Sequence, residues 1–266
     1  MYDSNIKNII EIEALNTRYK DKQILSDISL LVERKEIMVI MGHSGSGKST
    51  LLRHMIGLDT PVSGSVKLFG KEITKLKKSN LYELRKHIGV AFQSGALFSS
   101  MTLQENVELP LHQHTKLDHS TIRIMSRLKL ELMKLTDYED LMPAELSGGM
   151  LKRAGLARAV IMDPKILFFD EPSAGLDPVT SAELDELILQ LRNALNMTIV
   201  VVTHELESAF KIADRITVID NGSQIITGDK EAIRKSTDPR IVNMLQRKAV
   251  NKNIDADGYL NKLTRN

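Results

Sequence analysis

The most constraining feature of this chain is a short, wholly apolar segment that runs straight into a glycine-rich loop. Residues Ile37–Met41 are apolar at every position, which is typical of a strand buried on both faces inside a parallel sheet. Residues 42–50 then contain the pattern G-x-x-x-x-G-K-[ST], and an apolar stretch with helical character follows at 51–56. A strand, a glycine-rich loop and a helix in this order predict a phosphate-binding loop.

The residue types in this loop suit the phosphates of a nucleotide. Glycines let backbone N–H groups approach phosphate oxygens, because no Cβ blocks the way. The helix that follows points its positive N-terminal end at the same oxygens. Lys48 is placed to reach the β- and γ-phosphates, and the Ser49 hydroxyl is placed to ligate Mg²⁺.

A second apolar strand ends in two acidic residues. Lys165 and four apolar residues lead directly to Asp170 and Glu171. Open α/β sheets bind ligands at the carboxyl ends of their strands, so we expect both carboxylates at the phosphate site. One can hold Mg²⁺ directly or through water, and the other can orient or deprotonate an attacking water molecule. Two adjacent acids in a solvated turn are the simpler alternative, which the apolar strand and the phosphate loop disfavour.

Two more features are placed to meet a nucleotide. Thr203-His204 follows a third apolar strand, and a histidine there can contact the γ-phosphate. Ser147-Gly148-Gly149 opens a helix, which exposes free N–H groups and a positive helix end to an anion. Because the chain already has a complete phosphate loop, we expect this second helix end to complete the site of a second protomer; a plain N-capped helix is the alternative. The other histidines are interpreted as ordinary residues: His43, His54, His87, His112, His114 and His119.

Strands alternate with helices along the chain, which predicts an α/β fold with a helical insertion. Asn221-Gly222, between apolar segments, indicates a β-hairpin. Asp177-Pro178 marks the start of a helix, and residues 79–163 are expected to be mostly helical, with a capping-box pair at Thr102 and Glu105. Strands are expected at residues 9–15, 28–32, 37–41, 165–170, 198–202, 215–220 and 223–227.

Composition excludes several classes of protein. The 266 residues include 36 Lys and Arg against 34 Asp and Glu, a net charge of +2, which argues against a protein that grips nucleic acid through a large basic surface. The chain has no cysteine, so disulfides, thiol catalysis and cysteine metal sites are excluded. Its longest apolar run, Ile37–Met41, is far below the roughly 18 residues of a membrane span. Because residues 1–5 also lack the character of a signal peptide, we expect a soluble, intracellular protein.

The motifs together, and their order along the chain, resemble those of the nucleotide-binding subunits of ABC transporters, over most of the chain to about residue 245. The resemblance implies a P-loop ATPase of ABC type, with a RecA-like parallel-sheet core, an antiparallel β layer and a helical subdomain. It places Tyr19 where the family stacks an aromatic ring on adenine, Gln93 in a loop that touches the metal and couples to the permease, and residues 173–177 in a loop that crosses between protomers. The implied division is 1–93 with 164–245 for the ATP-binding core, 94–163 for the helical subdomain, and 246–266 for a C-terminal extension.

The resemblance also implies an ATPase with ATP and Mg²⁺ as cofactors, acting as a homodimer. Catalysis is assigned to Glu171, His204 and Lys48. Metal ligation is assigned to Ser49, Gln93 and Asp170. ATP binding is assigned to Tyr19, Gly42, His43, Ser44, Gly45, Ser46, Gly47, Lys48, Ser49, Thr50, Gln93, Ser147 and Gly149, the last two acting on the nucleotide of the opposing subunit.

A finer resemblance is carried by residues 93–98, 106–115 and 141–150, which are similar to the ATPase subunits of Mla phospholipid transport systems. Met150 stands where most ABC transporters have glutamine, but it fits this subgroup. This resemblance implies an integral-membrane permease, an MCE-domain substrate-binding protein and a small STAS-domain protein as partners. It implies phospholipid handled through the complex, no nucleic acid, and a peripheral location on the cytoplasmic side of the inner membrane. Tyr259-Leu260 is a hypothetical anchor on the neighbouring subunit, and a frayed terminus is the alternative.

Three alternatives stay open at this point. The same ATPase can serve another importer, for amino acids, metals or other small solutes, because substrate choice lies in the partner subunits. An ABC ATPase of DNA repair or translation is less consistent with a single cassette and with the roughly one hundred residues between Lys48 and Ser147. An adaptor with an inactive phosphate loop is disfavoured because Lys48, Asp170, Glu171 and His204 are all present.

Overall fold

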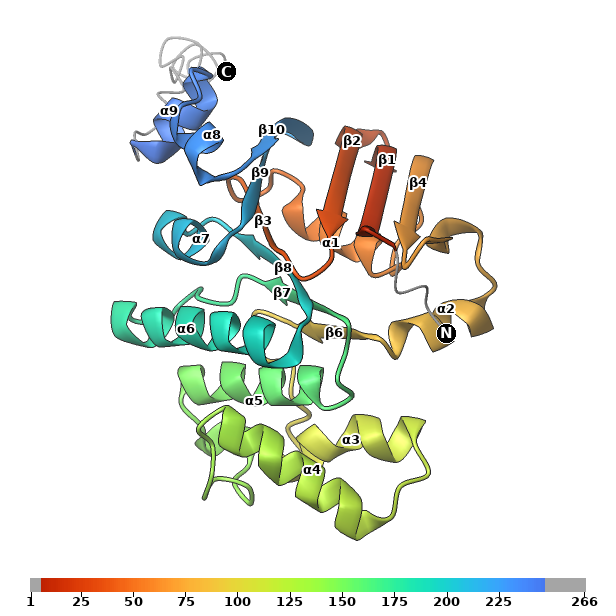
Figure 1. Ribbon diagram of the computed structural model, residues 1–266, viewed down its shortest axis with the longest axis vertical. Helices are drawn as coiled ribbons and strands as arrows, with labels where there is room; N and C mark the ends of the chain where they lie inside the picture. The colour runs from red at the N-terminus through yellow and green to blue at the C-terminus, as the bar shows by residue number, and fades with distance from the viewer. Residues whose placement is uncertain (1–5, 247–266) are drawn as a thin grey trace, which may run out of the picture.

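A computed structural model describes residues 6–246 (Figure 1). Its centre is a ten-stranded mixed sheet with the strand order β5-β4-β1-β2-β10-β9-β3-β8-β7-β6. The P-loop ATPase fold predicted from the sequence, with an antiparallel layer and a helical part, is confirmed. The strands are β1 (Asn8–Tyr19), β2 (Lys22–Glu33), β3 (Ile37–Met41), β4 (Ser63–Leu68), β5 (Lys71–Glu72), β6 (Ile88–Ala91), β7 (Ile166–Asp170), β8 (Thr198–Thr203), β9 (Arg215–Asp220) and β10 (Ser223–Gly228).

Parallel strands β3, β8, β7 and β6 form the part of the sheet that positions the site. Every residue of β3 and of β8 is buried, because helices or the antiparallel strands cover both faces. In the register, Met41 pairs with Thr203, and Asp170 pairs with Val202. The strand ends therefore coincide, and the residues after them meet at one edge of the sheet.

An antiparallel layer continues the sheet beyond β10. Strands β1 and β2 pair along most of their length, and β4 and β5 extend the layer outward. Both long strands exceed the predicted segments 9–15 and 28–32, because the antiparallel pairing carries polar positions along with the apolar ones. The extra length carries β1 as far as Tyr19.

Nine α-helices are described in residues 6–246, together with two short 3₁₀ turns. Helices α3, α4 and α5 pack against one another below the sheet in Figure 1, and α5 also contacts β6. The predicted capping box at Thr102 and Glu105 is present at the start of α3. The helices are α1 (Lys48–Met55), α2 (Lys78–Arg85), α3 (Leu103–His114), α4 (His119–Leu132), α5 (Gly148–Val160), α6 (Pro178–Leu195), α7 (Leu206–Ile212), α8 (Lys230–Arg234) and α9 (Pro239–Leu245).

One strand lies where the sequence predicted mostly helix. Strand β6 occupies Ile88–Ala91 within the stretch 79–163, so that part of the prediction is wrong. The strand has only four residues and pairs in parallel with β7 alone. Its existence depends on a neighbour almost eighty positions away in the sequence, which a local pattern cannot reveal. Helices α3, α4 and α5 do fall within 94–163, while the domain boundaries themselves stay a prediction.

Two local predictions are confirmed by their backbone geometry. Asn221 and Gly222 both have positive φ, at 47° and 77°, and connect β9 to β10 as a two-residue hairpin loop. The Asp177 carboxylate accepts hydrogen bonds from the N–H groups of Val179 and Thr180 at 3.0 Å each, which caps α6. The proposed anchor Tyr259-Leu260 and most of the predicted extension 246–266 lie outside the described residues.

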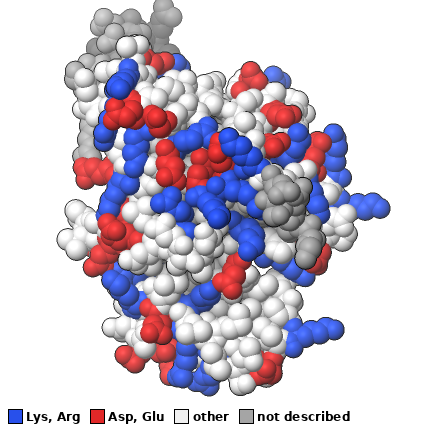
Figure 2. Space-filling view, in the orientation of Figure 1, with Lys and Arg blue, Asp and Glu red and all other residues white. Residues whose placement is uncertain are grey.

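Two hydrophobic clusters occupy the opposite faces of the parallel strands. Ile37, Val39 and Met41 pack with the helices on one face, and Met38 and Ile40 pack with α1 and the antiparallel layer on the other. The alternation explains why β3 is apolar throughout. On the face shown in Figure 2, basic and acidic side chains are interspersed, as the small net charge suggests. None of the helices within residues 6–246 is long and apolar enough to span a bilayer.

Candidate functional site

Two glycines of the loop after β3, Gly42 and Gly47, are demanded by the chain's own packing. A Cβ at Gly42 would lie 2.1 Å from the carbonyl oxygen of Ile219, and one at Gly47 would lie 2.7 Å from a methyl of Leu25. Gly47 also has φ 105°, a backbone conformation that side chains disfavour. Within the loop, the Ser46 N–H donates to the His43 carbonyl at 3.1 Å. The loop is thus folded tightly against the ends of β2 and β9.

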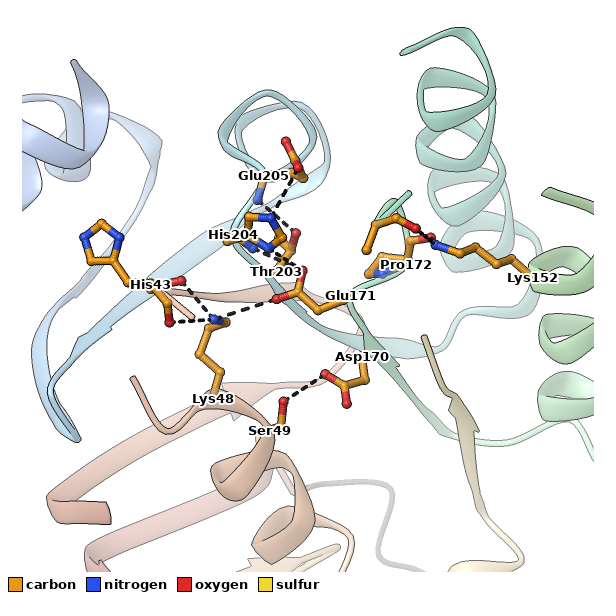
Figure 3. A network of polar contacts seen from close by, with 12 residues as sticks. His43, Lys48, Ser49, Lys152, Asp170, Glu171, Pro172, Thr203, His204 and Glu205 are labelled. Carbon is orange, nitrogen blue, oxygen red and sulfur yellow. Dashed lines mark hydrogen bonds and ion pairs between the residues drawn. The ribbon is translucent and has the colours of Figure 1, made fainter. Parts of the chain in front are cut away.

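Helix α1 begins at Lys48, directly after Gly47 at the N-cap position. The Lys48 ammonium donates to the Gly42 carbonyl at 2.9 Å and to the His43 carbonyl at 3.0 Å (Figure 3). Its side chain is only 6% exposed, and this burial lowers the pKa of Lys48, while the nearby carboxylates of Glu171 and Asp170 oppose the shift. The loop carbonyls hold the cation over the loop, where it can meet a phosphate oxygen.

Asp170 and Glu171 lie at the carboxyl end of β7, as predicted. The Ser49 hydroxyl donates to Asp170 Oδ1 at 3.3 Å. Burial raises the pKa of Asp170 above its ordinary value, and the neighbouring Glu171 raises it further. Glu171 adopts a left-handed backbone with φ 51°, while its N–H donates to the Val202 carbonyl at 2.8 Å. Such a conformation is uncommon for a residue with a side chain and often occurs at functional sites.

Glu171 links the loop lysine to the histidine after β8. One carboxylate oxygen lies 3.7 Å from the Lys48 ammonium, and the other accepts a hydrogen bond from His204 Nδ1 at 2.8 Å. His204 Nε2 lies 3.5 Å from a carboxylate oxygen of Glu205. Figure 3 shows Lys48, Glu171 and His204 turned toward one another from three different elements, α1, the end of β7 and the end of β8.

A cavity of about 430 Å³ opens over this cluster. It brings together most of the residues that the sequence assigned to ATP, including Tyr19 from β1 and Gln93 from the loop after β6. The His43 side chain points away from Lys48 in Figure 3, and its contribution to the cluster is the backbone carbonyl. The lining residues are Tyr19, Ile24, Ser44, Gly45, Gly47, Lys48, Ser49, Thr50, Gln93, Glu171 and His204.

Ser147 and Gly149 are not among the described residues that line this cavity. They lie at the start of α5, where the Ser147 hydroxyl accepts a hydrogen bond from the Met150 N–H at 3.3 Å. A Cβ at Gly148 would meet no atom of the described chain within 4 Å. At Gly149 a Cβ would meet only the Thr180 methyl, at 2.9 Å. Within one copy of the chain, this helix end is therefore separate from the phosphate loop.

The residues around Ser49 fit a magnesium ion that is shared with a ligand. Among the described residues, no group of three or more His, Cys, Asp or Glu side chains could hold a metal by itself. Mg²⁺ in nucleotide sites uses one or two protein ligands together with phosphate oxygens and water. The Ser49 hydroxyl and the half-buried Asp170 carboxylate lie side by side, and a cation would offset the partial burial of that carboxylate. The donor set suits Mg²⁺ once phosphate is bound.

Sequence analysis missed two sets of polar contacts around the site. Lys152 on α5 donates to the carbonyls of Pro172 at 2.6 Å and Ala174 at 2.5 Å, in the loop after Glu171. Asp59 accepts a hydrogen bond from the Tyr19 hydroxyl at 2.7 Å. Both contacts join residues that are at least twenty positions apart, so no local pattern signals them. A lysine on an otherwise glycine- and alanine-rich helix was the only available hint for the first.

Comparison with known proteins places this geometry in a family. The model for the ABC transporter family matches residues 25–174, from near the start of β2 through the loop after Glu171. The chain therefore belongs to the ABC transporter family, as one of its ATP-binding subunits, which hydrolyse ATP.

Individual relatives extend the match to almost the whole chain. The intermembrane phospholipid transport system ATP-binding protein MlaF of Haemophilus influenzae is 40% identical over 240 residues, 90% of this chain and 91% of the relative. The probable ribonucleotide transport ATP-binding protein mkl of Mycobacterium leprae is 39% identical over 89% of this chain and 68% of the relative. Among solved structures, a dimeric post-hydrolysis state of the ATP-binding cassette MJ0796, bound to ADP and Pi, aligns with TM-score 0.77 and 30% identity, over 83% of this chain and 98% of that one.

Proposed function

We propose that this chain hydrolyses ATP to drive phospholipid transport between the inner and outer membranes through a separate permease. The observation that carries the proposal is the combination of the Lys48–Glu171–His204 cluster with 40% identity to an intermembrane phospholipid transport ATPase along nine-tenths of both chains. The cluster supplies an ATPase site, and the relative supplies the class of cargo.

Phosphate binding is assigned to the loop and the start of α1. The loop amides and the Lys48 ammonium hold the β- and γ-phosphate oxygens, because six residues of the loop, Lys48 among them, line the cavity. Tyr19 supplies the aromatic face on which adenine stacks. Gly42, His43, Ser44, Gly45, Ser46, Gly47, Ser49 and Thr50 complete the loop.

Magnesium is assigned to Ser49 and Asp170, with Gln93 as a further ligand from the loop after β6. The ion, when bound, neutralises developing charge on the phosphates. The protein's own share is to hold the Ser49 hydroxyl and the Asp170 carboxylate 3.3 Å apart. Gln93 lines the same cavity, which supports its place in the set.

Water activation is assigned to Glu171, and His204 holds both the glutamate and the γ-phosphate. The left-handed backbone of Glu171 aims its carboxylate at Lys48 and His204. A positioned carboxylate that orients or deprotonates the water is worth about 10²–10⁴ in rate. Away from a nucleotide cavity, Lys48, Glu171 and His204 would form only an ion-pair network. Their position in the cavity is what favours the catalytic assignment.

A homodimer would complete the site with Ser147 and Gly149 of the opposing subunit. Within the described chain, no packing requires the glycine at 148, in contrast to Gly42 and Gly47. Within the described residues, the exposed start of α5 is capped only by its own Ser147, and such a helix N-terminus suits an anion brought by another molecule. The dimeric structure of the relative MJ0796 with ADP and Pi supports this arrangement.

Partner subunits would meet a groove of about 390 Å³ beside the loop that carries Gln93. Its walls combine aromatic and basic side chains, and the nearby Phe98 is 52% exposed. We assign this region, residues 94–111 included, to a cytoplasmic helix of the permease. By analogy with Mla phospholipid transport systems, an MCE-domain protein and a small STAS-domain protein complete the complex. The ATPase chain itself lies on the cytoplasmic side of the inner membrane. The groove is lined by Tyr82, Arg85, Lys86, Phe92, Pro110, His114, Arg158 and neighbouring residues.

Ribonucleotide transport is a second candidate, because the mkl relative is 39% identical. The lengths favour the phospholipid relative, since this chain covers 91% of it but only 68% of mkl. An importer of amino acids or other small solutes keeps the same ATPase with different partners. Nucleic acid is disfavoured by the net charge of only +2 and by the interspersed charges on the face shown in Figure 2.

The deciding experiment is to purify the tagged chain with its complex from native membranes and to identify the accompanying proteins and lipid by mass spectrometry. The proposal expects a permease, an MCE-domain protein and bound phospholipid. ATP-dependent transfer of labelled phospholipid by the reconstituted complex, absent in a Lys48→Ala complex, then tests activity. A solute-binding protein in place of the MCE-domain protein, with no lipid, would overturn the phospholipid assignment and leave the ATPase assignment standing.

A further inference from the structure

Among the described residues, Tyr19 is the only Phe, Tyr or Trp that lines the nucleotide cavity, yet about half of it is exposed. It is the last residue of β1, and it is 49% exposed. Its hydroxyl donates to Asp59 Oδ2 at 2.7 Å. This bond raises the pKa of Tyr19, so the phenol remains protonated and continues to donate. An exposed ring with one fixed hydroxyl has far less rotational freedom than a free one.

Asp59 is itself held in place from α1. Arg53, in the last turn of that helix, donates from Nε to Asp59 Oδ2 at 2.7 Å and from Nη2 to Oδ1 at 2.8 Å. This two-bond pairing lowers the pKa of Asp59 to about 2. The backbone between them is also closed, because the Leu58 N–H donates to the Arg53 carbonyl at 2.8 Å. Asp59 is therefore a charged acceptor with a fixed direction.

A second, buried contact joins the same two segments. His54, 1% exposed, shares a hydrogen bond of 2.6 Å with the Thr17 hydroxyl of β1. Burial lowers the pKa of His54, so the ring is neutral, and its Nδ1 donates to the Asp59 carbonyl at 3.1 Å. The end of β1 is thus attached to the end of α1 at Thr17 and at Tyr19.

We propose that Asp59, oriented by Arg53, is a positioning residue that sets the Tyr19 ring for the base of the nucleotide. The inference rests on the proposed function, in which Tyr19 stacks on adenine. Helix α1 then serves both halves of the ligand: its first turn carries Lys48 and Ser49 for the phosphates, and its last turn fixes the aromatic platform. Eight residues span about 12 Å, so one short rigid element sets the spacing between the two binding positions.

The expected effect is a loss of affinity that is confined to ligands with a base. Asp59→Ala releases the ring, which must then be ordered each time a nucleotide binds. Ordering one side chain corresponds to about a 3- to 10-fold weaker ATP affinity. The KM for ATP rises by the same factor, whereas kcat stays within twofold, because Glu171 and His204 are untouched. Binding of inorganic tripolyphosphate, which has no base, is unchanged.

The experiment measures ATP and tripolyphosphate binding by calorimetry on the full chain, and kcat and KM on the assembled complex. Asp59→Asn keeps an acceptor for the Tyr19 hydroxyl and recovers part of the ATP affinity. Tyr19→Phe keeps the ring but loses the hydroxyl, and Asp59→Ala adds little to it. Asp238→Ala is the matched control, because it removes a similar aspartate–arginine pair, with Arg240, from residues outside the cavity; its ATP affinity stays at the wild-type value.

Three results would overturn the inference. Equal weakening of ATP and tripolyphosphate in Asp59→Ala would mean that the residue supports the phosphate helix and not the ring. Unchanged ATP affinity in Asp59→Ala, with Tyr19→Ala at least tenfold weaker, would mean that the ring needs no positioning. If Tyr19→Ala also binds ATP normally, the stacking role in the proposed function fails and the inference fails with it, while Lys48→Ala still tests the phosphate loop separately.

Discussion

Helices α1 and α5 both begin beside glycines, but their first turns differ in what surrounds them. Helix α1 follows Gly47, which has no side chain to offer as a cap, and its first residues line the cavity with Glu171 and His204. Helix α5 follows Ser147, which caps its own first turn, and in the described part of the chain it faces no such cluster. The start of α1 therefore has its cluster within one copy of the chain, whereas the start of α5 would complete a site only in the proposed dimer.

The glycines beside α1 and α5 also differ in how tightly the chain packs around them. Packing within the chain excludes a side chain at Gly42 and Gly47, but it leaves open space at Gly148. The fold requires the glycine at position 47 but only tolerates the one at position 148, although both lie at the start of a helix. The phosphate loop can thus be understood from one copy of the chain, while the open space at Gly148 is consistent with the proposal that residues 147–149 act on the nucleotide of a second copy.

The largest expected effect tests the cluster at the start of α1. Glu171→Gln should lower ATP hydrolysis by about 10²–10³-fold, because the amide cannot accept the proton of the attacking water. ATP binding should persist, since Lys48 and the loop amides remain. With ATP retained between two copies, a dimer should accumulate in size-exclusion chromatography with light scattering. Hydrolysis at the wild-type rate would remove Glu171 from its assigned role.

Ser147→Arg tests the start of α5. A large cation at this position should block the closure of two copies and lower hydrolysis by about 10- to 100-fold. ATP affinity of the isolated chain should stay within twofold, because Ser147 does not line the cavity. Lys48→Ala is the contrasting control, since it should abolish binding in the isolated chain. If Ser147→Arg also loses binding there, the two helix ends share one site and the comparison fails.

A pair of alanine substitutions compares the glycines directly. Gly47→Ala should lower the free energy of unfolding by about 1–3 kcal/mol, because the new methyl meets Leu25 in a left-handed backbone. Gly148→Ala should change it by no more than about 0.5 kcal/mol, as at other uncrowded surface positions. Denaturant titration of both variants gives the two values. A Gly148→Ala loss as large as that of Gly47→Ala would show that the fold itself needs this glycine.

The smallest effect concerns the far end of α1. Because the folded pKa of Asp59, about 2, is below the ordinary 3.8, the pairing with Arg53 contributes stability at higher pH and loses it as the pH falls through 2. In Arg53→Gln the pKa of Asp59 should rise toward 3.8, since the pairing arginine is the main cause of the shift. Carboxyl-carbon NMR titration follows this residue. A value that stays near 2 would assign the shift to another group.

Much of the site at the start of α1 could be predicted from the sequence, because the patterns that indicate it are local. Ile37–Met41, the glycine loop and the pair Asp170-Glu171 are each continuous in the chain, and the register of β3, β7 and β8 brings them together. The hairpin at Asn221-Gly222 could also be predicted from the sequence, because its turn requires residues that tolerate positive φ.

The rest depends on contacts between distant residues. Strand β6 is too short to show a pattern of its own, and it forms only against β7. The Tyr19–Asp59 bond spans forty positions, and Lys152 reaches across twenty to the loop after Glu171. Nothing in the neighbourhood of any of these residues specifies its partner, because the folded sheet alone determines which segments meet.

The contact made by Lys152 has a consequence for how two copies would work in concert. Its ammonium joins α5 to the carbonyls of Pro172 and Ala174, just beyond Glu171. In the proposed dimer, a displacement of the α5 start by the opposing subunit would reach the loop after Glu171 of the same copy through the Lys152 side chain. Because a symmetric dimer contains this connection twice, closure at each of the two nucleotide sites would affect the other.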